Sequence, residues 1–118
     1  MDGIAINNVD YHHGCTALIY AAEKGHLDIV TCLSTLDGID INHADNEGNT
    51  VFISAAQSGQ LDIVKCLSTL NGIDINHVNN YGKTALMDAL RRHLDIAKYF
   101  STLGGIDINH ANDDVLLH

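Results

Sequence analysis

One segment of this chain occurs three times with few changes. It begins at Gly14 as GCTALIYAAEKGHLDIVTCLSTLDGIDINHA, and close copies begin at Gly48 and Gly82. The first two copies are offset by 34 residues, and the third is one residue shorter. Periods of roughly 20–50 residues are typical of stacked repeat architectures. The sequence therefore predicts one repeat domain over 1–118, divided into a half repeat at 1–9, full repeats at 10–44, 45–78 and 79–111, and a tail at 112–118.

Each repeat has the pattern of two short helices followed by a long loop. In the first repeat, Thr16 precedes apolar residues at helical spacing, and a threonine hydroxyl can accept a bond from a free helix N–H group. Gly25 suits the left-handed turn that ends a helix, and a second apolar pattern starts at Leu27. Gly38 then opens a loop rich in Asp, Asn and Gly. The predicted fold class is all-α, a helix-turn-helix stack in which neighbouring repeats bury each other's helices.

The overall charge restricts the partners of the chain. Its formal charge is −9, so nucleic acid and anionic membrane surfaces would repel it. No apolar run approaches the roughly 20 residues needed to span a bilayer, and no secretory signal is visible at the N-terminus. Three cysteines without a CxxC pair favour a reducing compartment, so we expect a cytoplasmic protein.

The segments GCTALIYAAEKGHLDIV and GIDINHAD, with their copies over 10–111, resemble ankyrin repeats. The resemblance implies a hairpin-like finger at each loop, paired antiparallel helices behind it, and a concave face formed by the fingers and the first helices. It also implies that the protein binds other proteins. The third repeat departs from the family pattern because it reads Arg91-Arg92-His93 where a glycine is expected, which predicts a tighter turn.

The residues that could carry chemistry form no known catalytic motif, so we expect no enzyme, no cofactor and no metal. His43, His77 and His110 share one repeat position, but stacked helices lie about 8–10 Å apart, too far to share an ion. Cys15 is expected to be exposed in the first finger. A nucleophilic Cys15 activated by His12 or His13 remains an alternative.

Cys32 and Cys66 occupy equivalent positions beside leucines of the second helices, and we expect both to be buried. The loop residues Asp40 and Asn42, with their copies, are expected to bond nearby backbone groups.

Residues that differ between otherwise similar repeats are the candidates for partner contact. By the resemblance they lie at finger tips and late in the first helices: His12, His13, Cys15, Glu23, Lys24, Asn46, Glu47, Asn49, Gln57, Ser58, Asn80, Tyr81, Lys83, Arg91 and Arg92. Basic residues collect in 79–111, where an aromatic beside arginines is typical of an interface anchor. We therefore expect a partner with an acidic segment near the third repeat.

A second hypothesis is a spacer or capping fragment of a longer array. The third repeat is expected to expose Leu94, Ala97, Tyr99 and Phe100 at its end, and such a surface favours further repeats or self-association into a homo-oligomer.

Overall fold

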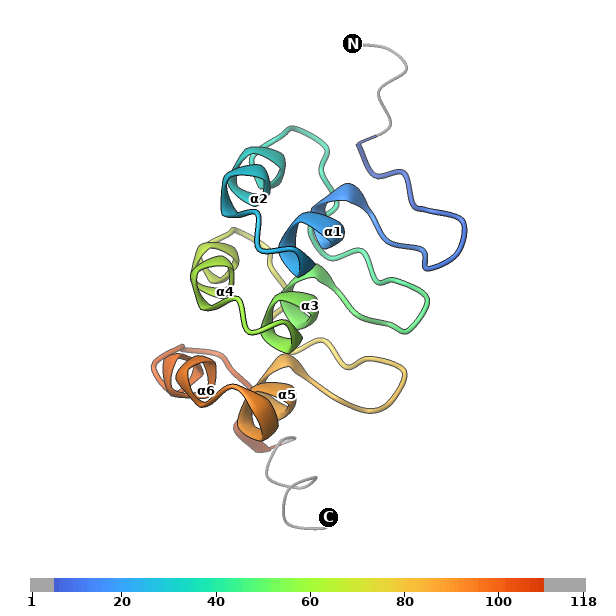
Figure 1. Cartoon of the computed structure of the whole chain (residues 1–118). Coiled ribbons are helices and arrows are strands. Elements are labelled where there is room, and N and C mark those ends of the chain that lie inside the picture. Colours follow the sequence, from blue (N-terminus) through green and yellow to red (C-terminus); the bar gives the residue numbers. More distant parts are fainter. Residues whose placement is uncertain (1–5, 110–118) are drawn as a thin grey trace.

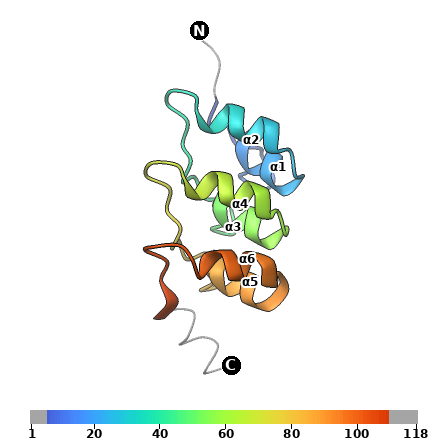
Figure 2. The same ribbon diagram turned by 90° about the vertical axis from the view of Figure 1, so that its left-hand side faces the viewer.

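The computed structural model describes residues 6–109, and these residues contain no strand. Their helices form three pairs that stack from the N-terminal to the C-terminal end (Figure 1). The first helix of each pair lies beside a projecting loop: finger 1 (residues 10–15), finger 2 (45–49) and finger 3 (79–83). Figure 2 shows the second helices as an outer row along the stack. The helices are α1 (Ala17–Glu23), α2 (Leu27–Ser34), α3 (Val51–Gln57), α4 (Leu61–Ser68), α5 (Ala85–Arg92) and α6 (Leu94–Phe100). The predicted all-α repeat stack is confirmed.

The first helices begin where the sequence predicts. The hydroxyl oxygen of Thr16 accepts a bond of 3.3 Å from the backbone N–H of Ile19, and Thr50 and Thr84 cap α3 and α5 in the same way. Gly25 and Gly59 end α1 and α3 with φ angles of +77° and +73°, a region that glycine enters without a Cβ clash.

The third turn is tighter, as expected. α5 ends at Arg92 and α6 begins at Leu94, so His93 alone joins the two helices. Its ring Nε2 lies 3.0 Å from the carbonyl oxygen of Gln57 in the repeat before. A side chain thus ties this turn to the stack where the other turns have a glycine.

Burial depends on the position of a residue within the stack. Ile63 and Ile96 are fully buried, whereas their counterpart Ile29 is 47% exposed because no repeat lies before α2 in the described residues. Phe100 stacks on Phe52 of the preceding repeat, with ring centroids 5.5 Å apart. Neighbouring repeats therefore share one continuous apolar core.

This packing corrects part of the predicted end surface. Leu94 is 64% exposed as expected, but Ala97 and Phe100 are buried and Tyr99 is half-buried. Phe100 stacks on Phe52 and Tyr99 bonds the hydroxyl of Ser68, so both side chains contact the preceding repeat. The predicted tail 112–118 and His110 lie outside the described residues.

The predicted burial of Cys32 and Cys66 is wrong. Cys32 is exposed and Cys66 is half-buried, because the inner side of α4 is occupied by Ile63, Val64 and Leu67. Cys66 directly precedes Leu67, about 100° away around the helix, and its sulfur lies 3.7 Å from the hydroxyl of Thr31. All three cysteines are free.

The loop asparagines join consecutive repeats, as expected for loop-satisfying residues. The Asn42 side chain donates to the carbonyl oxygen of Gly72 at 2.8 Å and accepts from the backbone N–H of Asp74 at 2.8 Å. Asn7 and Asn76 make the same pair of bonds to their own next repeats. Among the described helices, none is long and apolar enough to cross a membrane.

Candidate functional site

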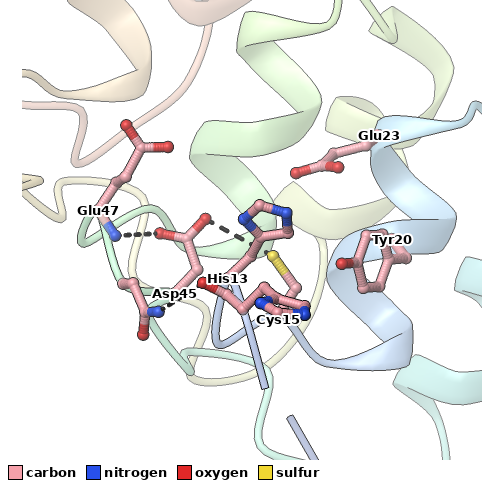
Figure 3. Close-up of a pocket in the computed structure, with 8 residues that line it drawn as sticks. His13, Cys15, Tyr20, Glu23, Asp45 and Glu47 are labelled. Carbon is pink, nitrogen blue, oxygen red and sulfur yellow. Dashed lines mark hydrogen bonds between the residues drawn. The ribbon is translucent and has the colours of Figure 1, made fainter. Parts of the chain in front are cut away.

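Six of the predicted contact residues line one open hollow between finger 1, α1 and finger 2 (Figure 3). The hollow has a volume of about 460 Å³. Its lining consists of His12, His13, Cys15, Glu23, Asn46 and Glu47, together with Tyr20 and Asp45. The structure therefore brings together residues from the first two repeats that are up to 35 positions apart in the chain.

Finger 1 is organised around the carboxylate of Asp10. This carboxylate accepts bonds from the backbone N–H groups of Cys15 at 2.7 Å and His13 at 3.3 Å, and from the Tyr20 hydroxyl at 2.8 Å. These donors favour the charged form, so the Cys15 N–H bond above all lowers the pKa of Asp10. The bond from the Tyr20 hydroxyl to Asp10 raises the pKa of Tyr20 to about 12, because the hydroxyl must keep its proton to donate.

Asp45 performs the same task in finger 2. Its carboxylate accepts from the backbone N–H groups of Glu47 and Asn49, each at 2.9 Å. The neighbouring Asn46 N–H donates to the carbonyl oxygen of His13 at 2.9 Å and so joins the two fingers. Asp45 is therefore fixed at the floor of the hollow by its own loop.

Cys15 is buried, which corrects the prediction that it is exposed. Only 5% of its surface is accessible, since it lies between the turn at Gly14 and the helix cap at Thr16. Its sulfur lies 3.8 Å from a carboxylate oxygen of Asp45. Burial, together with the negative charge of Asp45, raises the pKa of the thiol to about 12. A nucleophilic cysteine requires the opposite shift, so this environment offers no support for the catalytic alternative.

The carboxylate of Glu23 completes the anionic side of the hollow. It is half-buried at the last residue of α1, and burial followed by the charge of Asp45 raises its pKa. The charge of the neighbouring Lys24 acts on Glu23 in the opposite direction, but more weakly. The hollow thus concentrates negative charge at the N-terminal end of the face.

The second inter-finger contact is made by neutral groups. Asn49 is 7% exposed, and its side-chain oxygen accepts from the Asn79 amide at 2.9 Å. Asn80 is exposed and donates from its side chain to the carbonyl oxygen of Asn46 at 3.0 Å. Asn49 therefore holds fingers 2 and 3 together and is not presented to solvent.

The remaining predicted residues lie outside the hollow. Tyr81 is 65% exposed, and its hydroxyl donates to the carboxylate of Glu47 at 2.9 Å. Gln57 is half-buried and donates to Asp88 at 2.9 Å. The others lie on finger 3 or at the ends of the first helices: Lys83 is half-buried, whereas Lys24, Ser58, Arg91 and Arg92 are exposed.

The described loop histidines do not converge. His43 Nε2 lies 2.9 Å from the carbonyl oxygen of Gly14, and His77 Nδ1 lies 3.5 Å from the Asp74 carboxylate. Each of these rings therefore has its own local partner.

Sequence reasoning missed Tyr20 and Asp45 in the lining of the hollow. Both occupy positions that vary between repeats, since Tyr20 corresponds to Ser54 and Asp88, and Asp45 corresponds to Asn79. The other candidates were selected because they differ between repeats. Applying that criterion also to the base of each finger and to the first helices would have found Tyr20 and Asp45.

The comparisons with known proteins agree with this architecture. A family model described as ankyrin repeats (3 copies) matches residues 2–79 and also residues 35–112. No curated protein matches the chain. Because the family matches extend over nearly the whole sequence and the described residues form three stacked helix pairs, the chain belongs to the ankyrin repeat family.

Proposed function

We propose that this chain binds another protein through the concave face formed by its fingers and first helices. Ankyrin repeats are in general protein–protein interaction modules. The observation that carries the proposal is a constant framework with variable side chains on one face. Thr16, Thr50 and Thr84 cap the first helices in the same way. Exposed positions on the fingers and at the ends of the first helices differ in every repeat: His13, Glu47 and Tyr81, and Lys24, Ser58 and Arg92.

The face has opposite charge at its two ends. The N-terminal end has the carboxylates of Glu23, Asp45 and Glu47, and the C-terminal end has exposed Arg91 and Arg92 in the last turn of α5. Exposed Tyr81 lies on finger 3, and tyrosine and arginine are frequent interface anchors. We infer a partner whose acidic segment lies against the third repeat. The net charge of −9 argues against nucleic acid and membrane partners.

A charge-matched comparison tests this proposal. The variant Arg91→Ala/Arg92→Ala removes two cations from the concave end, and Lys65→Ala/Lys98→Ala removes two exposed cations from the second helices. For a partner that the wild-type chain captures, we expect the arginine variant to have an affinity at least about tenfold lower. The lysine variant should retain it. Equal retention by both variants would refute the acidic-segment proposal.

A second candidate is a segment of a longer array that self-associates through its ends. It is favoured by apolar side chains at both ends of the described stack: Ile29, Leu90, Leu94 and Ile108 are 47–64% exposed. The counterparts of Ile29 and Leu90 inside the stack, Ile63 and Ala56, are fully buried. The counterparts of Leu94 and Ile108, which are Leu61 and Ile75, are half-buried. Light-scattering mass over a concentration series should then rise, and Leu90→Asp should abolish the rise. A constant monomer mass would contradict this candidate.

We also propose a reducing, cytoplasmic location and no catalytic role. The three cysteines are free, and exposed Cys32 would be subject to oxidation outside a reducing compartment. Labelling of the intact protein should modify Cys32 rapidly and Cys15 slowly. Rapid modification of Cys15 would contradict its burial and would favour the hypothesis that it is a nucleophile.

A further inference from the structure

The hollow contains three groups of the kind that ligate metal ions. The Cys15 sulfur and a carboxylate oxygen from each of Glu23 and Asp45 all lie within 4.8 Å of one another. Cys15 is buried, and the two carboxylates are half-buried. They come from finger 1, the end of α1 and finger 2, so three separate segments converge on one point.

The combination of donors fits a zinc ion. Zn²⁺ accepts cysteine sulfur at about 2.3 Å and carboxylate oxygen or histidine nitrogen at about 2.0–2.2 Å, almost always in tetrahedral geometry. Tetrahedral ligands at those lengths lie about 3.3–3.8 Å apart. The Cys15 sulfur and a carboxylate oxygen of Asp45 are already 3.8 Å apart, so chiefly the Glu23 carboxylate needs to approach, by up to about 1 Å. The hollow of about 460 Å³ is open, and it leaves room for that movement.

His13 lines the same hollow from finger 1 and is the candidate for a fourth ligand. Figure 3 draws its ring near the Cys15 sulfur, and its nitrogens are not among the ligand atoms within 4.8 Å of one another, so the ring has to move toward the site. Finger 1 has one residue more than finger 2, since four steps separate Asp10 from Gly14 and three separate Asp45 from Gly48. The extra residue brings a second histidine into this finger.

The second junction of the stack offers an independent comparison. The residues 34 positions after Cys15, Glu23 and Asp45 are Asn49, Gln57 and Asn79. There, Asn79 donates to Asn49 at 2.9 Å, and Gln57 donates to the carboxylate of Asp88 at 2.9 Å. The fold thus requires no thiol or carboxylate at these three places. In the first junction all three amides are replaced by residue types that ligate metal ions.

We propose that Cys15, Glu23 and Asp45, with His13, form a zinc-binding site that joins finger 1, α1 and finger 2. On binding, the thiol proton is released to solvent and the sulfur coordinates as thiolate, as is usual for zinc-bound cysteine. The ion neutralises the carboxylates and holds the two fingers together. This site is independent of whether a protein partner occupies the concave face.

The direct test is a calorimetric titration with Zn²⁺ alone on the Cys32→Ser/Cys66→Ser protein, which keeps Cys15 as its only thiol. We expect one equivalent to bind, with release of protons to the buffer. With Co²⁺ in place of Zn²⁺, we expect a thiolate-to-cobalt charge-transfer band. Absence of the band, or no binding in the micromolar range, would overturn the proposal.

Variants assign the binding to these residues. Cys15→Asn should lower the zinc affinity at least about 100-fold, beyond the usual effect of losing an outer-sphere partner. Glu23→Gln and Asp45→Asn should each lower the zinc affinity at least about tenfold. If Cys15→Asn does not fold, these two variants test whether zinc binds at this site. His77→Asn removes a surface histidine that pairs with Asp74 and should leave the affinity unchanged. If His77→Asn abolished binding and the other variants did not, zinc would belong to the loop histidines.

Discussion

The two junctions between repeats share a backbone and differ in chemistry. At the first, the N–H of Asn46 donates to His13 at 2.9 Å, and at the second the N–H of Asn80 donates to Glu47 at 3.0 Å. Around these equivalent bonds the first junction has the thiol of Cys15 facing Asp45, whereas the second has an amide pair. The repeat framework therefore fixes where side chains meet, and individual substitutions decide what they can do there.

The apolar support of the two junctions should be equally strong. Ile63 is buried at the first and Ile96 at the second, so each change to alanine should lower the free energy of unfolding by about 2–5 kcal/mol. Ile29→Ala, at a position 47% exposed, should have a clearly smaller effect. Urea unfolding measures all three. A large difference between Ile63→Ala and Ile96→Ala would show that the junctions differ in packing as well as chemistry.

The amide pair should matter at the second junction in its own right. Asn79 is 6% exposed, donates to Asn49 and accepts from the backbone N–H groups of Tyr81 and Lys83. Asn79→Ala removes these partners and should lower stability by about 1–3 kcal/mol. Asn79→Asp keeps the two accepted bonds and should have a smaller effect in the same unfolding experiment. If Asn79→Ala were neutral, the amide pair would not stabilise the junction.

The first junction should weaken at alkaline pH through its buried thiol. The pKa of Cys15 is raised from 9.0 to about 12, so its contribution is complete below the unfolded value and is lost as pH rises toward the folded value. At a pH near 10 the Cys15 thiol should stabilise the fold by about 1 kcal/mol less than at neutral pH, relative to Cys15→Ala. Thermal unfolding of both proteins across this window measures the difference. Parallel pH profiles would contradict the buried, carboxylate-facing thiol.

The smallest effect concerns an exposed bond between fingers 2 and 3. The Tyr81 hydroxyl donates to Glu47, whereas His13 occupies the corresponding place in finger 1. Tyr81→Phe should change stability by no more than about 0.5 kcal/mol, as is usual at exposed positions. The same variant should leave the zinc affinity unchanged, because Tyr81 does not line the hollow. A loss of zinc binding would place finger 3 within the site as well.

Repetition made most of the framework predictable from sequence. Thr16 and Gly25 have strong local preferences that neighbouring structure does not override, so the helix ends were predicted correctly. The short turn at His93 was predicted because the third repeat lacks the glycine found there in the other two. Local chemistry and spacing were sufficient at these positions.

Burial was harder to predict because it depends on the neighbouring repeat. In helices of seven or eight residues, one step of about 100° separates buried Leu67 from half-buried Cys66, and a periodic pattern does not resolve that step. Cys15 belongs to a finger by sequence, yet it lies beneath finger 2 of the next repeat. The hollow was only partly foreseen for the same reason, since Asp45 reaches it from 30 residues away.

The central claim is that side-chain identity, on a shared backbone, gives the first junction a chemistry that the second lacks. Thermal unfolding with and without Zn²⁺ tests it most directly, using the wild type and the variant Cys15→Asn/Glu23→Gln/Asp45→Asn, which copies the second junction. At about 100 times the dissociation constant, zinc should stabilise the wild type by about 2.7 kcal/mol. The variant should fold but show no shift. Equal shifts in both proteins, or none in either, would contradict the claim.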